Sequence, residues 1–458
     1  MSLLIRNGTL VTAERSFAAD ILIDGERIRE VAAGIPAGTA ERVMDAAGLL
    51  VMPGGVDVHT HLDMPLGDTV SSDDFETGTR AAAFGGTTSL IDFATQARGG
   101  GMRQALETWR KKAEGRATVD YGFHMIVTDL SAGVEELDAM VGEGVTSFKL
   151  FMAYPGTLMV DDATIFRAML RTAENGALIV IHAENGGVID VLVRRAVAEG
   201  KKAPIYHALT RPAAAEAEAV HRALTMAEIA GVPVYIVHVS SGAALRHISE
   251  ARDRGVRAFG ETCPQYLLLS VDELARPGFE GAKYVFTPPL REKPNQEDLW
   301  EGLVSGHLQV VATDHCPFNY VGQKDLGKDD FTKIPNGAPV IEHRLQLLYH
   351  CGVNARRINI NRFVDLVSTA PARIFGLYPR KGALEPGSDA DIVLWDPQAE
   401  HLISAQTHHM RVDYSMFEGF RVKGRARTVL SRGEVIVDAG RFLARPGRGT
   451  YLKRAASG

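Results

Sequence analysis

The feature that most restricts the fold of this 458-residue chain is a regular alternation of short β-prone runs with stretches rich in Ala, Glu and Arg. Such alternation predicts parallel strands connected by helices that cover the sheet. Eight runs of this kind occur, at 54–62, 87–94, 120–128, 147–153, 177–185, 234–241, 257–267 and 310–318. Eight strands interleaved with helices predict an α/β fold of the (β/α)8 TIM-like barrel type.

Both ends of the chain carry a different pattern, with short strands separated by Gly, Asn and Asp. Asn-Gly and Asp-Gly pairs between apolar runs predict β-hairpins. The runs are 3–12, 19–31, 388–397, 427–437 and 441–444. Neither end has enough strand to enclose its own core, so we expect the two to form one small β-sandwich. The predicted domains are therefore 1–52 with 378–458 for the sandwich, including a C-terminal tail, and 53–377 for the barrel.

Composition narrows the classes of protein that fit. The chain is 45% hydrophobic and 23% charged with a formal net charge of −6, which is typical of a soluble globular protein and unfavourable for nucleic-acid binding. It has no apolar run long enough to cross a membrane, and its first residues do not resemble a signal peptide. The cysteines, Cys263, Cys316 and Cys351, fit neither a disulfide framework nor a thiolate zinc site. We expect a cytoplasmic protein with no membrane or nucleic-acid partner.

Several side chains that can bind metals occur at or near the ends of predicted barrel strands. In (β/α)8 barrels the reactive groups gather at the carboxyl ends of the strands. The residues are His59, His61, Lys149, His182, His238 and Asp314. Independent surface residues would rarely fall in this pattern, so we expect these side chains to meet at one mouth of the barrel.

The histidines have two interpretations when each is taken alone. His59 and His61 are two apart on a strand, so both imidazoles face the same side and can bind one ion. Ordinary hydrogen-bonded histidines also explain such a pair, and a single buried histidine such as His182 or His238 is more often a core residue than a ligand. Their combination on several strands of one barrel favours metal binding.

Lys149 and Asp314 are ambiguous in the same way. The lysine can reach solvent or meet a carboxylate, and the aspartate can cap the next helix. Beside converging histidines, a neutral Lys149 amine can instead take up carbon dioxide to form an anionic carbamate that bridges two ions. Asp314 is then a ligand and a proton shuttle. By strand alternation we expect His315 and Cys316 to point elsewhere.

The chain resembles the dihydropyrimidinase and D-hydantoinase family of the amidohydrolase superfamily along essentially its whole length. The stretches that carry the resemblance include PGGVDVHTHLDMP, FGGTTSLIDFA, SFKLFMAY, HAENG, HALTRP, GETCPQYL, PPLREK, TDHCPF and GSDADIVLWDP. Matches in a conserved order are more specific than any single motif. The resemblance implies a barrel with a sandwich from both termini, two divalent metal ions with zinc expected, a carboxylated lysine and a homotetramer.

The resemblance also assigns roles to particular residues. His59, His61 and Asp314 correspond to ligands of one ion, and His182 and His238 to ligands of the other. Lys149, as N6-carboxylysine, corresponds to the bridge between them.

Three further positions correspond to substrate contacts in the family. Tyr154 matches a tyrosine that polarises the carbonyl under attack. Thr287 and Asn336 match positions that grip the ring amide mainly through backbone groups. Many relatives have serine where Thr287 stands, which matters little if the contact uses backbone atoms.

The implied reaction is the opening of a cyclic ureide or imide, such as a 5-substituted hydantoin or a dihydropyrimidine, to an N-carbamoyl amino acid. A hydroxide bridging the two ions attacks the ring carbonyl, and the oxygen develops negative charge near Tyr154. Asp314 accepts the hydroxide proton and passes it to the departing ring nitrogen.

Two alternatives remain beside this assignment. An allantoinase-type amidohydrolase ranks second, and dihydroorotase-like chains carry an arginine where this chain has Asp63. A dihydropyrimidinase-like interaction protein without activity is a further class, but such proteins have lost several ligands, whereas all six positions are retained here.

Overall fold

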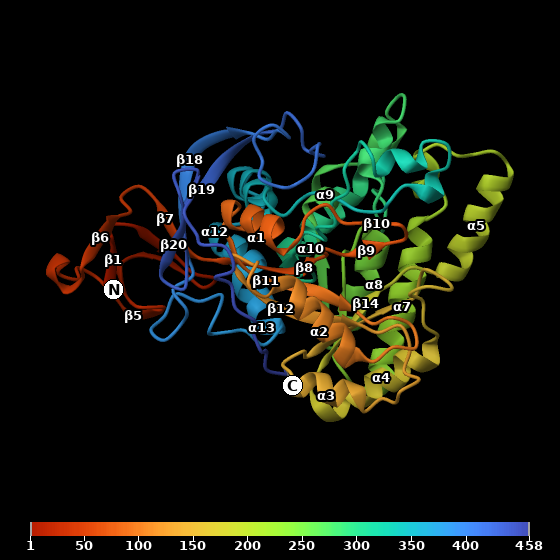
Figure 1. Ribbon diagram of the computed structural model, residues 1–458, viewed down its shortest axis with the longest axis horizontal. Helices are drawn as coiled ribbons and strands as arrows, with labels where there is room; N and C mark the ends of the chain where they lie inside the picture. Colours follow the sequence, from red (N-terminus) through yellow and green to blue (C-terminus); the bar gives the residue numbers. More distant parts are fainter. Residues whose placement is uncertain (1, 457–458) are drawn as a thin grey trace.

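The computed structural model describes residues 2–456 and has a barrel beside a smaller β-sandwich (Figure 1). The barrel strands are all parallel and follow one another in sequence order. They are β8 (Gly55–Thr60), β11 (Thr87–Thr95), β12 (Asp120–Ile126), β13 (Ser147–Phe151), β14 (Leu178–His182), β15 (Val234–Ile236), β16 (Ala258–Thr262) and β17 (Val310–Val311). This confirms the predicted fold class, and each strand overlaps the run expected for it.

The first and last strands meet just beyond the end of β17. Thr60 forms a parallel bridge with His315, and the His61 amide donates to the His315 carbonyl at 2.8 Å. The curled sheet is closed here at the same edge where His59, His61 and Asp314 lie. Closure therefore brings the first and eighth segments of the barrel into the contact that the predicted site requires.

Helices cover the outside of the barrel (Figure 1). The longer ones are α1 (Phe75–Phe84), α2 (Met102–Ala113), α3 (Glu136–Gly142), α4 (Asp162–Asn175), α5 (Gly186–Ala198), α7 (Ala213–Ala230), α8 (Gly242–Asp253) and α10 (Pro294–Ser305). Short helices are α6 (Ile205–Leu209), α9 (Pro264–Leu268), α11 (Arg344–Leu348), α12 (Ile360–Val364) and α13 (Ala370–Ile374). Local signals place their ends: the Asp161 side chain accepts from the Thr164 amide before α4, and Gly176 ends α4 with φ of 71°.

Most of the predicted runs are longer than the strands that they contain, as the seventh and eighth runs illustrate. Residues 264–267 of the seventh run belong to α9 rather than to a strand, because Pro264 occupies the first turn of that helix. In the eighth run only Val310–Val311 is strand, and the chain then continues irregularly past Asp314. The apolar residues of both runs are buried or partly buried, as predicted. Their pattern did not indicate where each strand ends.

The sandwich consists of two sheets built from both ends of the chain. One has the order β5 (Arg27–Ala32), β4 (Asp20–Asp24), β1 (Ser2–Arg6), β6 (Arg42–Asp45). The other has the order β21 (Arg441–Phe442), β20 (Glu434–Asp438), β19 (Arg421–Ser431), β18 (Ile392–Leu402), β7 (Leu50–Pro53), β2 (Thr9–Val11), β3 (Ser16–Ala18). Because β7 pairs antiparallel with β18, the N-terminal and C-terminal segments share one sheet, as predicted.

The hairpin predicted around Asn7 and Gly8 is wrong. β1 pairs with β4 and β6, whereas β2 pairs with β3 and β7 in the other sheet. Asn7 has φ of 65°, and a Cβ on Gly8 would lie 2.5 Å from Val51 Cγ2, so the pair turns the chain closely across the sandwich. An Asn-Gly pair signals a left-handed turn, but it does not specify which sheet the next strand joins.

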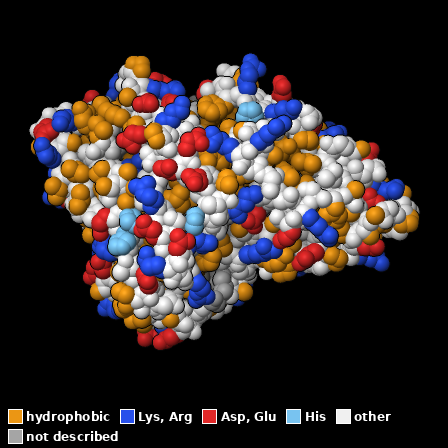
Figure 2. Space-filling model, turned by 180° about the vertical axis from the view of Figure 1, so that it is seen from behind, with side chains coloured by type: hydrophobic (Ala, Val, Ile, Leu, Met, Phe, Trp, Pro, Cys, Tyr) orange, Lys and Arg blue, Asp and Glu red, His pale blue; other side chains and the backbone are white. Residues whose placement is uncertain are grey.

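Charge is mixed on one face of the molecule. On the face shown in Figure 2, Lys and Arg side chains are interspersed with Asp and Glu, and neither sign forms a large continuous field there. Within residues 2–456 no helix is long and apolar enough to span a membrane. A short hairpin of β9 (Pro65–Leu66) and β10 (Thr69–Val70) contributes Pro65, Leu66 and Gly67 to the lining of the barrel mouth described next.

Candidate metal centre

Nearly all of the predicted site residues line one cavity of about 310 Å³ at the carboxyl ends of the strands. They are His61, Lys149, Tyr154, His182, His238, Thr287, Asp314 and Asn336. The remaining one, His59, is fully buried immediately behind this lining. Six strands or their following loops thus deliver these side chains to one place, as the positions at strand ends predicted.

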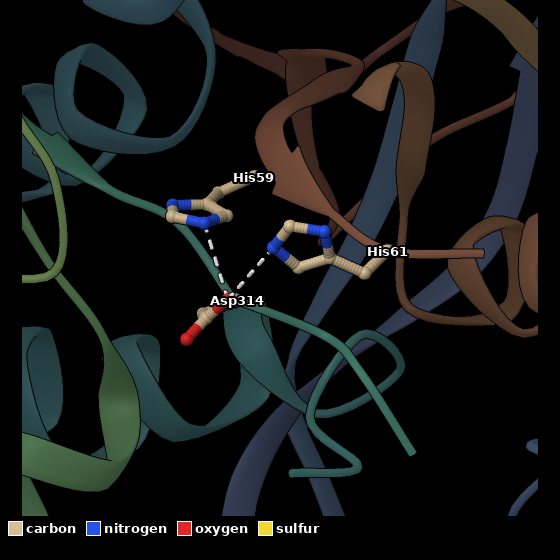
Figure 3. Close-up of side chains that lie close together, drawn as sticks. All are labelled: His59, His61 and Asp314. Atoms are coloured by element: carbon tan, nitrogen blue, oxygen red, sulfur yellow. Dashed lines mark ion pairs between the residues drawn. The ribbon is translucent and has the colours of Figure 1, made fainter. Parts of the chain in front are cut away.

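His59, His61 and Asp314 form a compact group (Figure 3). Asp314 Oδ1 lies 3.1 Å from His59 Nε2 and 3.3 Å from His61 Nε2. In Figure 3 each imidazole directs a ring nitrogen toward the Asp314 carboxylate. Three donor atoms therefore converge where one cation can contact all of them.

A second pair of donors lies beside this group. His182 Nδ1 is 3.0 Å from His238 Nε2, and the His238 ring centroid is 5.4 Å from that of His59. Lys149 Nζ lies 3.0 Å from His59 Nε2, on the same wall of the cavity. The arrangement has two adjacent groups of histidine nitrogens with the lysine beside them.

Buried carboxylates behind two of the histidines fix which ring nitrogen faces the cavity. Glu261 contacts His59 Nδ1, so Nε2 of that ring is directed inward. Glu184 Oε2 lies 3.0 Å from His182 Nε2, so Nδ1 of that ring is directed inward. A carboxylate on the far nitrogen orients a ligating histidine and raises its basicity.

The sequence alone did not indicate a role for these two glutamates, although each belongs to a stretch that carries the family resemblance. Glu184 follows His182 by two residues in HAENG, and Glu261 opens the ETCPQYL part of the seventh run. Glu261 also accepts from the Tyr235 hydroxyl at 2.7 Å and from the His238 amide at 3.1 Å. A carboxylate inside an apolar strand was the available signal, because such a charge requires buried partners.

The protonation states suit cation binding. Burial lowers the pKa of His61 to about 4, and it lowers the pKa of His182 and of His238 as well. Burial raises the pKa of Asp314, but His59, His61 and His238 outweigh it and hold that pKa well below its usual range. Neutral imidazoles and an ionised carboxylate are the forms that ligate metals.

His59 behaves differently, because a second carboxylate touches it. Burial and Lys149 lower its pKa, but the charges of Glu261 and Asp314 outweigh them, and the pKa is raised. A cation at this position would take the place of the proton that the two carboxylates favour. Two carboxylates therefore favour a positive charge at His59.

Lys149 is buried without a carboxylate partner: no ion pair to it occurs within residues 2–456. Burial lowers its pKa to about 8, while Asp314 and Glu261 act in the opposite direction. Its Nζ lies 4.2 Å from the Phe93 ring centroid and 4.9 Å from that of Phe151. An amine in this setting loses its proton readily, and the neutral form is the one that reacts with carbon dioxide.

The donor set fits divalent ions. Nitrogen and oxygen ligands of zinc lie at roughly 2.0–2.2 Å from the ion, which puts neighbouring donors of a tetrahedral site roughly 3.4 Å apart. The separations of 3.1 Å and 3.3 Å from Asp314 Oδ1 to His59 Nε2 and His61 Nε2, and of 3.0 Å between His182 and His238, are close to that value. An ammonium on Lys149 does not fit such a site, whereas a carbamate does.

Three of the predicted residues have left-handed backbone conformations. Tyr154 has φ of 66°, His238 of 39° and Asp314 of 51°. Residues other than glycine adopt this region at a cost, and such strain concentrates at functional sites. The backbone is thus bent where it presents these side chains to the cavity.

Tyr154 lines the cavity together with Thr287 and Asn336. Burial raises the pKa of Tyr154 to about 12, although Arg211 and hydrogen bonds with the Thr287 and Asn336 side chains lower it in part. The hydroxyl therefore stays protonated at neutral pH and can act as a donor. The structure brings together the three residues for which the resemblance implied substrate contacts.

The expectation that His315 and Cys316 both point away from the site is wrong for Cys316. Cys316 lines the cavity together with Asp314, because the strand ends at Val311 and the left-handed backbone at Asp314 breaks the alternation on which the expectation rested. His315 does point away: its Nε2 contacts Asp73 Oδ2 at 3.0 Å, and its Nδ1 accepts from the Val340 amide. His315 thereby anchors the loop that carries Asp314.

A (β/α)8 barrel with this histidine-rich mouth and a sandwich from both termini defines the class of amidohydrolase-type barrels. The model of the Amidohydrolase family matches residues 50–436. The D-hydantoinase of Streptomyces coelicolor is 54% identical over 98% of this chain and 97% of its own length, and the D-hydantoinase of Geobacillus stearothermophilus is 51% identical over 100% and 98%. The crystal structure of the dihydropyrimidinase from Brevibacillus agri has a TM-score of 0.98 at 52% identity and covers 100% of this chain and 99% of that one.

The chain belongs to the amidohydrolase family, in the branch of the D-hydantoinases and dihydropyrimidinases. It is a cyclic amidohydrolase, as its resemblance in sequence implied.

Proposed function

We propose that this enzyme hydrolyses 5-substituted hydantoins and dihydropyrimidines to N-carbamoyl amino acids. The observation that carries the proposal is the convergence of the predicted donors and Tyr154 on one cavity, in a chain whose full-length relatives are named D-hydantoinases. Opening a cyclic ureide requires an activated water, a donor for the developing oxyanion and a proton carrier for the leaving nitrogen. The residues of the cavity offer the oxyanion donor and the proton carrier, and the ions that they would hold would supply the activated water.

The donor groups would hold two divalent ions, with zinc as the expected metal. His59, His61 and Asp314 would bind one ion, and His182 and His238 the other. Lys149 would bridge them as N6-carboxylysine, which replaces a repelled ammonium by an anion. Bound ions at this position supply an acidified water and polarise the substrate carbonyl.

The protein groups then have separate tasks. The protonated Tyr154 hydroxyl donates to the carbonyl oxygen as negative charge develops on it. Asp314, ionised and directed into the cavity, takes a proton from water and delivers it to the ring nitrogen. The backbone groups of Thr287 and Asn336 hold the ring amide.

The cavity favours a neutral ring substituent. Among the residues that line it, Lys149 is the sole lysine or arginine, and its place is at the metal centre. Asp63, where dihydroorotase-like chains carry arginine, lies outside the lining, and its carboxylate is 3.8 Å from Lys112 Nζ. Apolar groups from Met64, Leu66 and Leu158 surround the space that a 5-substituent would enter.

The test is a side-by-side assay of the metal-loaded enzyme on dihydrouracil, both enantiomers of 5-substituted hydantoins, allantoin and dihydroorotate. We expect ring opening of the hydantoins and dihydrouracil, with little turnover of the anionic dihydroorotate. Dihydroorotate turnover comparable to that of dihydrouracil would contradict the proposed substrate class, and preference for allantoin would favour an allantoinase.

We also propose that the enzyme is a cytoplasmic homotetramer. Cys263, Cys316 and Cys351 are all free thiols, which supports a reducing compartment. Helix α5 lies at the edge of the molecule and exposes 48% of Val188 and 65% of Val191, which supports burial of this helix against another copy (Figure 1). Mass measured in solution by light scattering tests the oligomeric state.

A further inference from the structure

The two segments that carry Thr287 and Asn336 contain no helix or strand of their own. Residues 285–288 and 335–337 are irregular, yet both line the cavity at the place where the proposed function puts the ring amide. Backbone groups can select a ring only if their positions are fixed to a fraction of an ångström. Other groups must therefore hold these segments.

A buried lysine connects the two segments. Lys324 is fully buried, and its Nζ donates to the Val285 carbonyl and to the Pro335 carbonyl, each at 2.9 Å. The Gly337 amide also donates to the Val285 carbonyl at 3.1 Å. One amine thus connects Val285, which precedes Thr287 by two residues, with Pro335, which directly precedes Asn336.

The neighbouring carbonyls of the first segment are held as well. The Phe286 carbonyl accepts from His207 Nε2 at 2.9 Å, and the Pro288 carbonyl accepts from the Tyr266 hydroxyl at 2.8 Å. In the part of the chain that the structure describes, the backbone N–H and C=O of Thr287 have no hydrogen-bond partner, and the same holds for Asn336. The carbonyls on either side of Thr287, and the one directly before Asn336, are thus occupied, whereas the backbone groups of Thr287 and Asn336 themselves, in two residues that line the cavity, are left for a ligand.

Lys324 differs from a lysine that merely stabilises the fold through an ion pair. It forms no salt bridge within residues 2–456, and burial lowers its pKa to about 7. Burying an amine without a carboxylate is costly, and a methylene chain of similar volume would avoid that cost. A neutral amine still has two N–H groups, which is the number that the two carbonyls need.

We propose that Lys324 is a positioning residue that fixes the spacing between the two backbone segments that grip the substrate ring. This inference rests on the proposed function, because it assigns those segments to the ring amide. Loss of the two hydrogen bonds would let the segments separate, so the ring would bind more weakly while the metal donors, which lie on other elements, stay in place.

The test compares Lys324→Met with Lys328→Met, a matched control on an exposed lysine in the same turn. Both metal-loaded variants are assayed for KM and kcat on a 5-substituted hydantoin, for bound metal and for Tm. We expect Lys324→Met to raise KM at least tenfold with the metal content unchanged, and Lys328→Met to match the wild type. A lower Tm with unchanged KM would show a purely structural role and overturn the inference.

A second variant covers the case in which Lys324→Met does not fold. Lys324→Gln keeps one donor that can reach a carbonyl. We expect its KM to be higher than that of the wild type, but by less than the tenfold rise expected when both hydrogen bonds are lost. An unchanged KM in Lys324→Gln would overturn the inference. If the wild-type enzyme opens none of the rings, the proposed function itself is contradicted. That outcome is distinct from an unchanged KM in the variants, which contradicts only the role of Lys324.

Discussion

Two buried lysines, Lys381 and Lys149, lie at opposite ends of the barrel. They differ in whether carboxylates surround the amine, and this decides whether the amine keeps its proton. Strand β12 runs between them: its first residue, Asp120, contacts Lys381, and its last residue, Ile126, pairs with Lys149. Lys381 Nζ lies 2.7 Å from Asp120, 2.9 Å from Asp389 and 2.8 Å from Asp391. Lys149 has no such carboxylate and lies 3.0 Å from an imidazole nitrogen of His59.

The two ends of the barrel differ accordingly in the state of the lysine. At the base, burial lowers the pKa of Lys381, but the three aspartates outweigh it, and the pKa is raised above its ordinary value. At the mouth, burial dominates and lowers the pKa of Lys149 to about 8. The base therefore holds a fixed ammonium that joins barrel to sandwich, and the mouth holds an amine available for modification.

The largest expected effect is at the mouth. We expect Lys149→Ala to lose bound metal and to lower kcat by about 10³-fold or more, since the ions supply several kcal/mol of transition-state stabilisation. A small carboxylic acid should partly restore both by filling the vacated bridge. Metal analysis and kinetics on one sample check this result. Gentle intact-mass measurement would show whether Lys149 is modified. A wild-type enzyme that is fully active and dinuclear with an unmodified Lys149 would contradict the proposed difference between the two lysines.

At the base we expect loss of stability instead. Lys381→Met leaves buried aspartates without their shared cation and should lower the free energy of unfolding by about 3–5 kcal/mol. Urea denaturation measures this change, and metal content in the folded protein should stay unchanged. The control is Lys453→Met, whose side chain is 63% exposed and 3.9 Å from Glu143, so that its effect should be at most about 1 kcal/mol.

Tyr154 offers a third comparison at the mouth, because the proposed mechanism assigns it to the reaction and not to the metal donors. We expect Tyr154→Phe to lower kcat by about 10²-fold, as for loss of a single oxyanion donor. Metal content and unfolding free energy should match the wild type. If kcat is unchanged at full metal occupancy, the tyrosine only packs against the cavity.

The smallest effect is a change in the pH dependence of stability. Burial raises the pKa of Asp120, but Lys381 and Arg432 outweigh it and lower that pKa. Asp120 thus stabilises the fold above its unfolded pKa of about 3.9, and this contribution is lost as pH falls through the lower folded value. The difference in unfolding free energy between wild type and Lys381→Met should be largest at neutral pH and shrink below about pH 4. A difference that stays constant to pH 3 would contradict the base network.

Much of the fold and of the candidate site was predictable from local pattern. Alternating apolar runs and helical stretches indicated the eight strands, and the positions of His182 and Asp314 at run ends indicated the mouth. The failures were of another kind. The Asn7-Gly8 turn and the orientation of Cys316 depended on which strands pair and where a strand ends, and local sequence does not encode either reliably.

The sequence by itself determined which residue types stand at the strand ends, because burial and strand periodicity are local properties. Only the tertiary structure decided which buried charges have partners. Glu261 reaches His59 from 202 residues away, Lys381 reaches Asp120 from 261 residues away, and Lys324 joins carbonyls of two separate loops. These contacts exist only after the barrel closes, and the energy of a buried charge depends on its neighbours in space rather than in sequence.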